Sequence, residues 1–175
     1  MKNYSVQQYQ QSECANWNAF IGQAKNATFL FHRDFMEYHK DQFEDFSLMI
    51  FDNKKLVAVL PANKVGNIVY SHQGLTYGGL VYSPKLNGEK VAAILDSLLS
   101  FFKKKEVQSF YFKPIPSFYS SKGNAETDFF MIKKGAFLER KEMNLAINLA
   151  MPFTISKSNL NYFRKIEELD LKLIE

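Results

Sequence analysis

The stretch from Ser71 to Gly79 gathers the residue types of this chain that are best suited to chemistry. A histidine can act as a general base near neutral pH, and we take His72 and Tyr77 as the candidate catalytic residues. Glycines in a strand indicate a bulge or a place where a ligand comes close to the main chain. The alternative is a glycine-rich turn between two strands, with His72 buried. Ser71 is excluded as a nucleophile activated by His72, because the side chains of adjacent strand residues point to opposite faces.

Arg33 is a further candidate, because a guanidinium group can bind a phosphate or a carboxylate through two parallel hydrogen bonds. It directly precedes Asp34 in the sequence. In the alternative interpretation, Asp34 caps a helix and Arg33 is solvated. We keep both interpretations.

The elements that must position these residues follow from the spacing of apolar residues. Alternation and β-branched runs predict strands, and apolar residues at i, i+3, i+4 predict helices. This order of elements favours an α+β fold, with a mixed, mostly antiparallel sheet flanked by helices. The expected strands are 3–10, 46–51, 56–60, 67–70, 79–82, 107–112, 137–149 and 171–174, and the expected helices are 12–26, 33–42, 91–102, 126–133 and 160–169.

The composition excludes several classes of protein. Of 175 residues, 46% are hydrophobic and 23% are charged, which excludes a disordered chain. Cys14 is the single cysteine, so an internal disulfide and a cysteine-built zinc site are excluded. No apolar run is long enough for a membrane span, and the first residues lack the apolar core of a signal peptide. We therefore expect a cytoplasmic protein, and its net charge of +4 is too small to indicate a nucleic-acid partner.

The order of elements and several sequence words resemble the N-terminal half of the FemAB-related branch of the GNAT acyltransferase superfamily. The resemblance covers nearly the whole chain and rests on Phe31–His39, Phe43–Asp45, Leu60–Asn63, Ser71–Gly79 and Lys113–Pro116. It implies a GNAT-like fold and a transferase that joins an activated acyl or aminoacyl group to an amine, without a metal. The implied donor is acyl-CoA or aminoacyl-tRNA, a substrate and not a firmly bound cofactor.

The resemblance also implies roles for individual residues. The amine attacks the carbonyl directly, and main-chain N–H groups stabilise the developing oxyanion. His72, Gln73, Thr76 and Tyr77 are then expected to line the cleft, and Gly78 and Gly79 to supply the N–H groups. Arg33 is expected to contact an anionic part of the substrate.

The sequence departs from the family pattern in two ways. The loop Ser83–Lys90, which matches the phosphate-binding loop of simple GNAT enzymes, has a single glycine, and Glu89 stands where an anion would bind. The chain also ends inside an expected strand, at Glu175, without a second half. We therefore expect residues 1–175 to form one GNAT-like domain, the N-terminal half of a two-domain protein, which pairs with a second half or forms a homodimer. The alternative is a non-catalytic interaction module or a truncated gene product.

Overall fold

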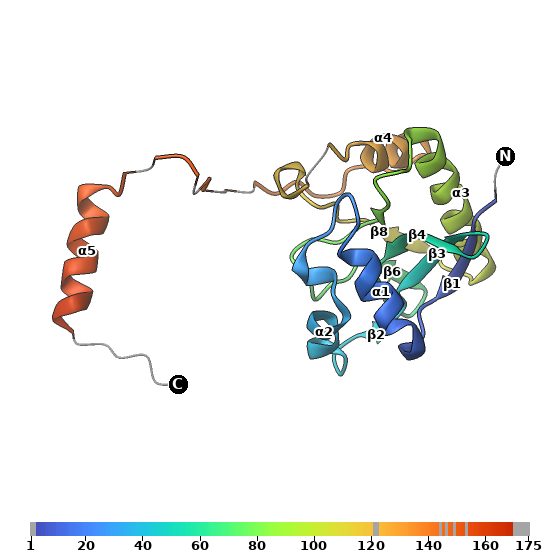
Figure 1. Ribbon diagram of the computed structural model, residues 1–175, viewed down its shortest axis with the longest axis horizontal. Helices are drawn as coiled ribbons and strands as arrows, with labels where there is room; N and C mark the ends of the chain where they lie inside the picture. Colours follow the sequence, from blue (N-terminus) through green and yellow to red (C-terminus); the bar gives the residue numbers. More distant parts are fainter. Residues whose placement is uncertain are drawn as a thin grey trace. The chain divides into compact units, whose positions relative to one another are not determined.

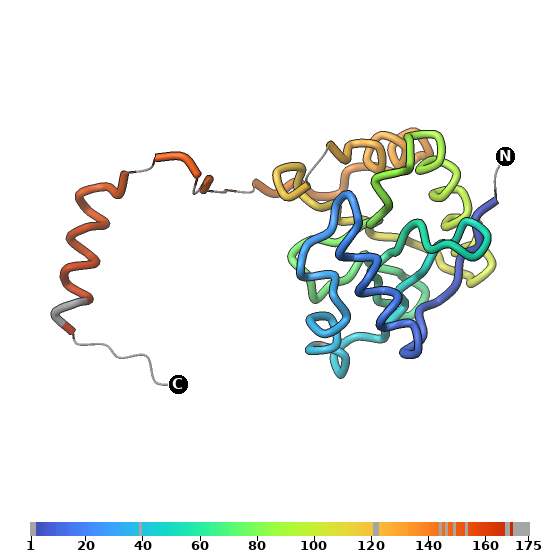
Figure 2. Tube along the Cα trace, viewed as in Figure 1, coloured from blue at the N-terminus to red at the C-terminus, as the bar shows by residue number. Residues whose placement is uncertain are grey.

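The computed structural model describes residues 3–120, 123–143, 145, 147–148, 150–152 and 154–169. The chain divides into two compact units, Met1–Glu139 and Arg140–Glu175, which are described separately. Figure 1 shows the elements of both units, and Figure 2 allows the chain path of the first unit to be followed by its colour.

The first unit contains two four-stranded sheets. One has the order β1 (Ser5–Gln8), β3 (Leu48–Asp52), β4 (Lys55–Leu60) and β7 (Val81–Tyr82), and all of its neighbours are antiparallel. The other has the order β2 (Glu44–Asp45), β5 (Asn63–Val65), β6 (Ile68–Tyr70) and β8 (Ser109–Tyr111). In this second sheet β2, β5 and β6 are antiparallel neighbours, and β6 and β8 are parallel.

Two hydrophobic clusters lie on opposite faces of the strands, because successive side chains of a strand point to opposite sides. In β3, Leu48 and Ile50 join the cluster that contains the apolar residues of α3 (Gly88–Lys104). Met49, between them, joins the cluster that contains residues of α1 (Cys14–Ile21) and α2 (Arg33–Met36). Figure 1 shows α1 and α2 near one another, and α3 beside α4 (Glu126–Lys133).

Helix α3 has a capping residue at its N-terminus and basic residues at its C-terminus. The Asn87 side chain caps it by accepting a hydrogen bond from the Lys90 N–H, and Lys103 and Lys104 lie in its last turn. Helix α1 contributes Trp17, which is fully buried and donates from its indole Nε1 to the Phe31 carbonyl at 2.8 Å. The remaining helical segments among the described residues of the first unit are short 3-10 turns at Gln11–Glu13, Phe29–Phe31, Glu37–His39 and Ser117–Tyr119.

The second unit contains α5 (Lys157–Glu168), whose apolar residues Leu160, Phe163 and Ile166 are 42–56% exposed. The predicted strand over 137–149 is wrong for the residues of this segment that the structure describes, since none of them is in a strand. A strand exists only where a neighbouring strand supplies hydrogen bonds, and this segment has no such neighbour among the described residues. The predicted strand over 171–174 lies outside the described residues.

The other predicted elements are confirmed with shifted ends, except that the helix predicted over 33–42 is α-helical only in Arg33–Met36. Strands β2 and β5 were not predicted. Within the described part of the chain, no helix combines the length and the apolar character that a membrane crossing requires.

Candidate functional site

The site is built where a parallel pair of strands separates. Strands β6 and β8 run side by side from Ile68 and Ser109, and the pairing ends in a single parallel bridge between Gly78 and Pro114. Beyond this bridge β7 continues along β4, and it is the last strand of its sheet. The chain after Pro114 instead enters the 3-10 turn at Ser117–Tyr119. This separation leaves the outer edge of β7 without a neighbouring strand.

Ser71 and Gly78 form the neck of the loop that was singled out in the sequence. The Gly78 N–H donates to the Lys113 carbonyl at 2.8 Å, and the Lys113 N–H donates to Ser71 Oγ at 2.8 Å. A Cβ atom on Gly78 would lie 1.7 Å from the Ser71 carbonyl oxygen, so no larger residue fits. The Gly78 N–H is therefore already bound within the chain, and its expected role as a donor to the substrate stays a prediction.

Leu80 directly precedes β7, and its main-chain N–H lies at the outer edge of this strand. Gly79, with φ of +87°, turns the chain into the edge. The Leu80 carbonyl accepts from Asn26 Nδ2 at 2.8 Å, so the groups of Leu80 face outward. The Leu80 N–H donates to no other described residue, although Leu80 is only 2% exposed. A buried N–H without an acceptor is uncommon and marks a place where a ligand oxygen could bind.

His72 and Arg33 line one small cavity of about 150 Å³ together with Met36, Glu37, Lys40, Phe43 and Asp45. His72 has φ of +69°, a left-handed conformation that few residues other than glycine adopt. The His72 ring packs edge to face against the Phe43 ring, with 5.6 Å between the ring centroids. A Cβ atom on Gly74 would lie 2.6 Å from the Phe43 ring, so this glycine lets the loop close over the aromatic side chain.

Arg33 is held by neighbouring groups of its own chain. Its Nη2 contacts Glu37 at 2.8 Å and Asp45 at 2.5 Å, and its Nη1 donates to Ser47 Oγ at 3.2 Å. Burial acts to lower the pKa of Arg33, but Asp45 and Glu37 outweigh it and the pKa is raised. The guanidinium also lies over the Tyr9 ring at 3.8 Å. Glu37 and Asp45 already bind Nη2 of Arg33, and the predicted contact of Arg33 with an anionic substrate stays a prediction.

The other predicted residues lie elsewhere around the loop. Gln73 is exposed and exchanges two hydrogen bonds of 2.8 Å with the buried Asn63 side chain. Thr76 is exposed, and Tyr77 is buried, with its hydroxyl donating to Thr28 Oγ1 at 3.1 Å. None of these residues lines the cavity of His72 and Arg33. The structure therefore brings two of the predicted site residues together and separates the rest.

Sequence reasoning missed Leu80, Asn26 and the polar cluster beside them. Lys25 Nζ contacts Glu126 Oε1 at 2.6 Å, and the Tyr82 hydroxyl donates to Glu126 Oε2 at 2.9 Å. Burial acts to raise the pKa of Glu126, but hydrogen bonds from Lys25 and Tyr82 outweigh it and lower the pKa. Burial, together with Glu126, raises the pKa of Tyr82. The glycine pair before Leu80 was the single sequence signal for this edge.

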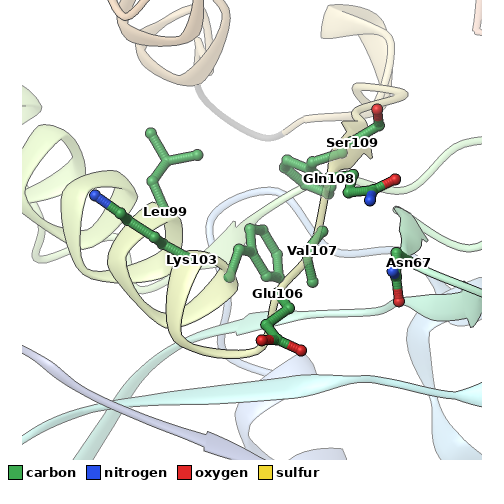
Figure 3. Close-up of a pocket in the computed structure, with 9 residues that line it drawn as sticks. Asn67, Leu99, Lys103, Glu106, Val107, Gln108 and Ser109 are labelled. Atoms are coloured by element: carbon green, nitrogen blue, oxygen red, sulfur yellow. The ribbon is translucent and has the colours of Figure 1, made fainter.

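A larger hollow of about 590 Å³ lies between the end of α3 and the start of β8, as Figure 3 shows. Leu99 and Lys103 approach it from the helix, Ser109 from the first position of β8, and Gln108 from the residue before this strand. None of the predicted site residues lines this hollow. The described residues also contain no group of histidine, cysteine and carboxylate side chains that could hold a metal ion.

Comparison with known proteins identifies the fold. No protein-family model matches the chain, and no curated protein sequence matches it. The ribosomal-protein-S18-alanine N-acetyltransferase of Escherichia coli is similar in structure, with 14% identity, a TM-score of 0.52, and coverage of 75% of this chain and 76% of that chain.

Two aminoglycoside acetyltransferases are similar as well. AAC(6')-Iy, in complex with the bisubstrate analog CoA-S-monomethyl-acetylneamine, has 11% identity and a TM-score of 0.52, over 83% of this chain and 99% of that chain. AAC(6')-Ih of Acinetobacter baumannii has 13% identity and a TM-score of 0.50, over 84% of this chain and 99% of that chain. The chain therefore has the fold of GNAT acetyltransferases, and the predicted fold class is confirmed.

Proposed function

We propose that this chain is an N-acyltransferase of the GNAT type, which transfers an acyl group from acyl-CoA to an amine. One observation carries the proposal: the buried Leu80 N–H has no acceptor among the described residues, at the point where two parallel strands separate. A carbonyl oxygen placed there would gain a hydrogen bond that strengthens as negative charge develops on it. The fold shared with acetyltransferases supports the same reaction class.

In the proposed reaction, the amine nitrogen attacks the thioester carbonyl and forms the C–N bond. The carbonyl oxygen becomes an oxyanion, which the Leu80 N–H stabilises. Collapse of this intermediate breaks the C–S bond and releases the thiolate, which takes up a proton from solvent. His72, which follows Ser71 at the neck of the loop, is the proposed acceptor of the proton that the amine loses.

The motifs that resemble the FemAB-related branch support a more specific proposal, that the chain is the N-terminal half of a FemAB-related protein. Aminoacyl-tRNA is then a second donor to test, and the cytoplasm is the proposed location. An alternative function is a non-catalytic interaction module. It is favoured by Arg33, whose charge is already neutralised by Glu37 and Asp45, and by the exposed apolar residues of α5.

The test is a titration monitored by NMR with leucine-selective isotope labelling. A Leu80→Ile variant assigns the Leu80 amide signal by its loss. We expect acetyl-CoA to shift this signal more than the other leucine signals, and free coenzyme A, which lacks the acyl carbonyl, to shift it less. A donor at a hundredfold excess over its Kd should also stabilise the protein by about 2.7 kcal/mol. Leucine amides that stay unmoved with both acetyl-CoA and aminoacyl-tRNA would contradict the proposal.

Turnover is tested separately, by measuring thiol release from acetyl-CoA in the presence of a panel of primary amines. Release that depends on the amine, and that yields the matching amide, supports acyl transfer. Donor binding without any release would favour the non-catalytic alternative.

A further inference from the structure

Lys25 and Asn26 run along the outer edge of β7 in the place of a neighbouring strand. The Asn26 side chain donates from Nδ2 to the Leu80 carbonyl at 2.8 Å and accepts from the Tyr82 N–H, through Oδ1, at 3.0 Å. The Lys25 N–H donates to the Tyr82 carbonyl at 2.9 Å. An asparagine side chain carries an amide group, so it can offer one donor and one acceptor as a peptide group does. Asn26 therefore substitutes for one peptide unit of a missing strand.

This substitute is buried and anchored. Asn26 is 3% exposed, and its partners on β7 lie more than 50 residues away in the sequence. The adjacent Lys25 is fixed through its ammonium group to Glu126 of α4, which also binds the Tyr82 hydroxyl. The Leu80 carbonyl and the N–H and carbonyl of Tyr82, which Asn26 and Lys25 occupy, are therefore unavailable to a ligand unless this segment moves.

An extended ligand with secondary amides binds a free strand edge through its main-chain-like N–H and C=O groups. The arm of acyl-CoA contains such amides, and if it lay along this edge it would hydrogen-bond to the Leu80 carbonyl and the Tyr82 N–H, which Asn26 already occupies. We infer that Asn26 is a specificity-determining residue, which excludes an amide-bearing donor arm from the edge of β7 and leaves only the Leu80 N–H for the acyl carbonyl. This inference rests on the proposed function, because it concerns the donor of the same reaction.

The experiment compares S-acetylpantetheine, which has the amide arm but no nucleotide, across three forms of the full chain. Asn26→Ala removes the substitute and uncovers both positions on β7. Asn63→Ala is the matched control, because Asn63 is likewise a buried asparagine whose side chain makes two hydrogen bonds. Both are 2.8 Å long and join Asn63 to Gln73, so they do not involve β7. We expect Asn26→Ala to bind S-acetylpantetheine roughly tenfold more tightly than the wild type, since two hydrogen bonds are gained. Asn63→Ala should bind like the wild type.

The site of binding is read from the Tyr82 amide signal, with tyrosine-selective labelling. This signal should shift with S-acetylpantetheine in Asn26→Ala and stay in place in the other two forms. Equal affinity in all three forms, or a Tyr82 signal that already shifts in the wild type, would overturn the inference. If Asn26→Ala does not fold, Asn26→Ser is tested in its place, because a hydroxyl can satisfy one of the two groups.

A thioester without amides separates this inference from the proposed function. Ethyl thioacetate should shift the Leu80 amide equally in the wild type and in Asn26→Ala. If it shifts this amide in neither form, the proposed function fails, and the Tyr82 measurement still decides the role of Asn26. If it shifts Leu80 in both while S-acetylpantetheine gains no affinity, the proposed function stands and the role of Asn26 is refuted.

Discussion

Gly78 is the residue at which the loop of the candidate site closes on itself. Replacing it with alanine would place a carbon 1.7 Å from the Ser71 carbonyl oxygen, a main-chain atom that cannot move aside. We expect Gly78→Ala to lower the free energy of unfolding by more than about 3 kcal/mol, at the upper end of overpacking costs. Urea unfolding followed by circular dichroism measures this change.

Gly123→Ala is the control for this prediction, because nothing lies within 4 Å of the added carbon. Its free energy of unfolding should stay within about 0.5 kcal/mol of the wild type. Equal stability of the two variants would mean that Ser71 and Gly78 do not approach as described.

His72 can be tested without disturbing its backbone. His72→Asn removes the imidazole but retains a residue that tolerates the left-handed conformation. If His72 takes the proton of the amine, the rate of acyl transfer should fall by about 10²–10⁴-fold, while the free energy of unfolding changes by less than about 2 kcal/mol. His32→Asn should leave the rate unchanged. A rate retained in His72→Asn would assign the base to another group or to water.

At the candidate site, the sequence directs attention to side chains that could carry chemistry. The motif around His72 and the choice of Arg33 led to two residues that share a cavity. Leu80 was not predictable, because its proposed contribution comes from the main chain and an apolar side chain gives no signal. The hydrogen bond from the Gly78 N–H to the Lys113 carbonyl was not predictable either, since the sequence contains nothing that indicates this partner.

At the scale of elements, the spacing of apolar residues predicted the helices and strands whose apolar side chains are buried. Helix α3 and strands β3 and β4 have strong apolar patterns and were found with small shifts of their ends. Strand β5 follows Pro61 and has three residues, too few for a periodic pattern. The segment 137–149 has the alternation of a strand but lacks a pairing neighbour among the described residues, and a single sequence cannot show whether such a neighbour exists.

The contact of α4 with Lys25 and Tyr82 leads to a prediction about acid stability. Glu126→Gln should lower the free energy of unfolding at neutral pH by roughly 1–3 kcal/mol, less than for a fully buried pair because the Glu126 side chain is 30% exposed. The pKa of Glu126 in the folded protein is lowered below its ordinary value of 4.5, so its contribution is present above that value. It is lost as the pH falls through the lower, folded pKa.

The difference between wild type and Glu126→Gln, measured by urea midpoints, should therefore shrink as the pH falls below 4.5 and through the lower, folded pKa. Asp96→Asn is the control, because the ion pair of Asp96 with Lys134 is more exposed, and its loss should cost at most about 1 kcal/mol. A difference that is independent of pH would show that the carboxylate charge of Glu126 is not what stabilises α4.

At the scale of the whole molecule, the first unit contains both hydrophobic clusters. All of their members lie between Tyr4 and Met131. A chain shortened to residues 1–139 should therefore keep its cooperative thermal transition, with a Tm within about 4 °C of the full chain. Circular dichroism at the wavelength of helix absorption measures it. A much lower Tm would mean that residues 140–175 contribute to this core.

The burial of Trp17 gives the protein an optical reporter of its own. It is the single tryptophan of the chain, and the Arg33 guanidinium lies 5.4 Å from its ring. Indole fluorescence responds to nearby charge, so the emission of the unlabelled protein reports on the ion pairs between α2 and β2. Ligands that enter the cavity beside Arg33 can therefore be screened by emission intensity alone, without any added dye.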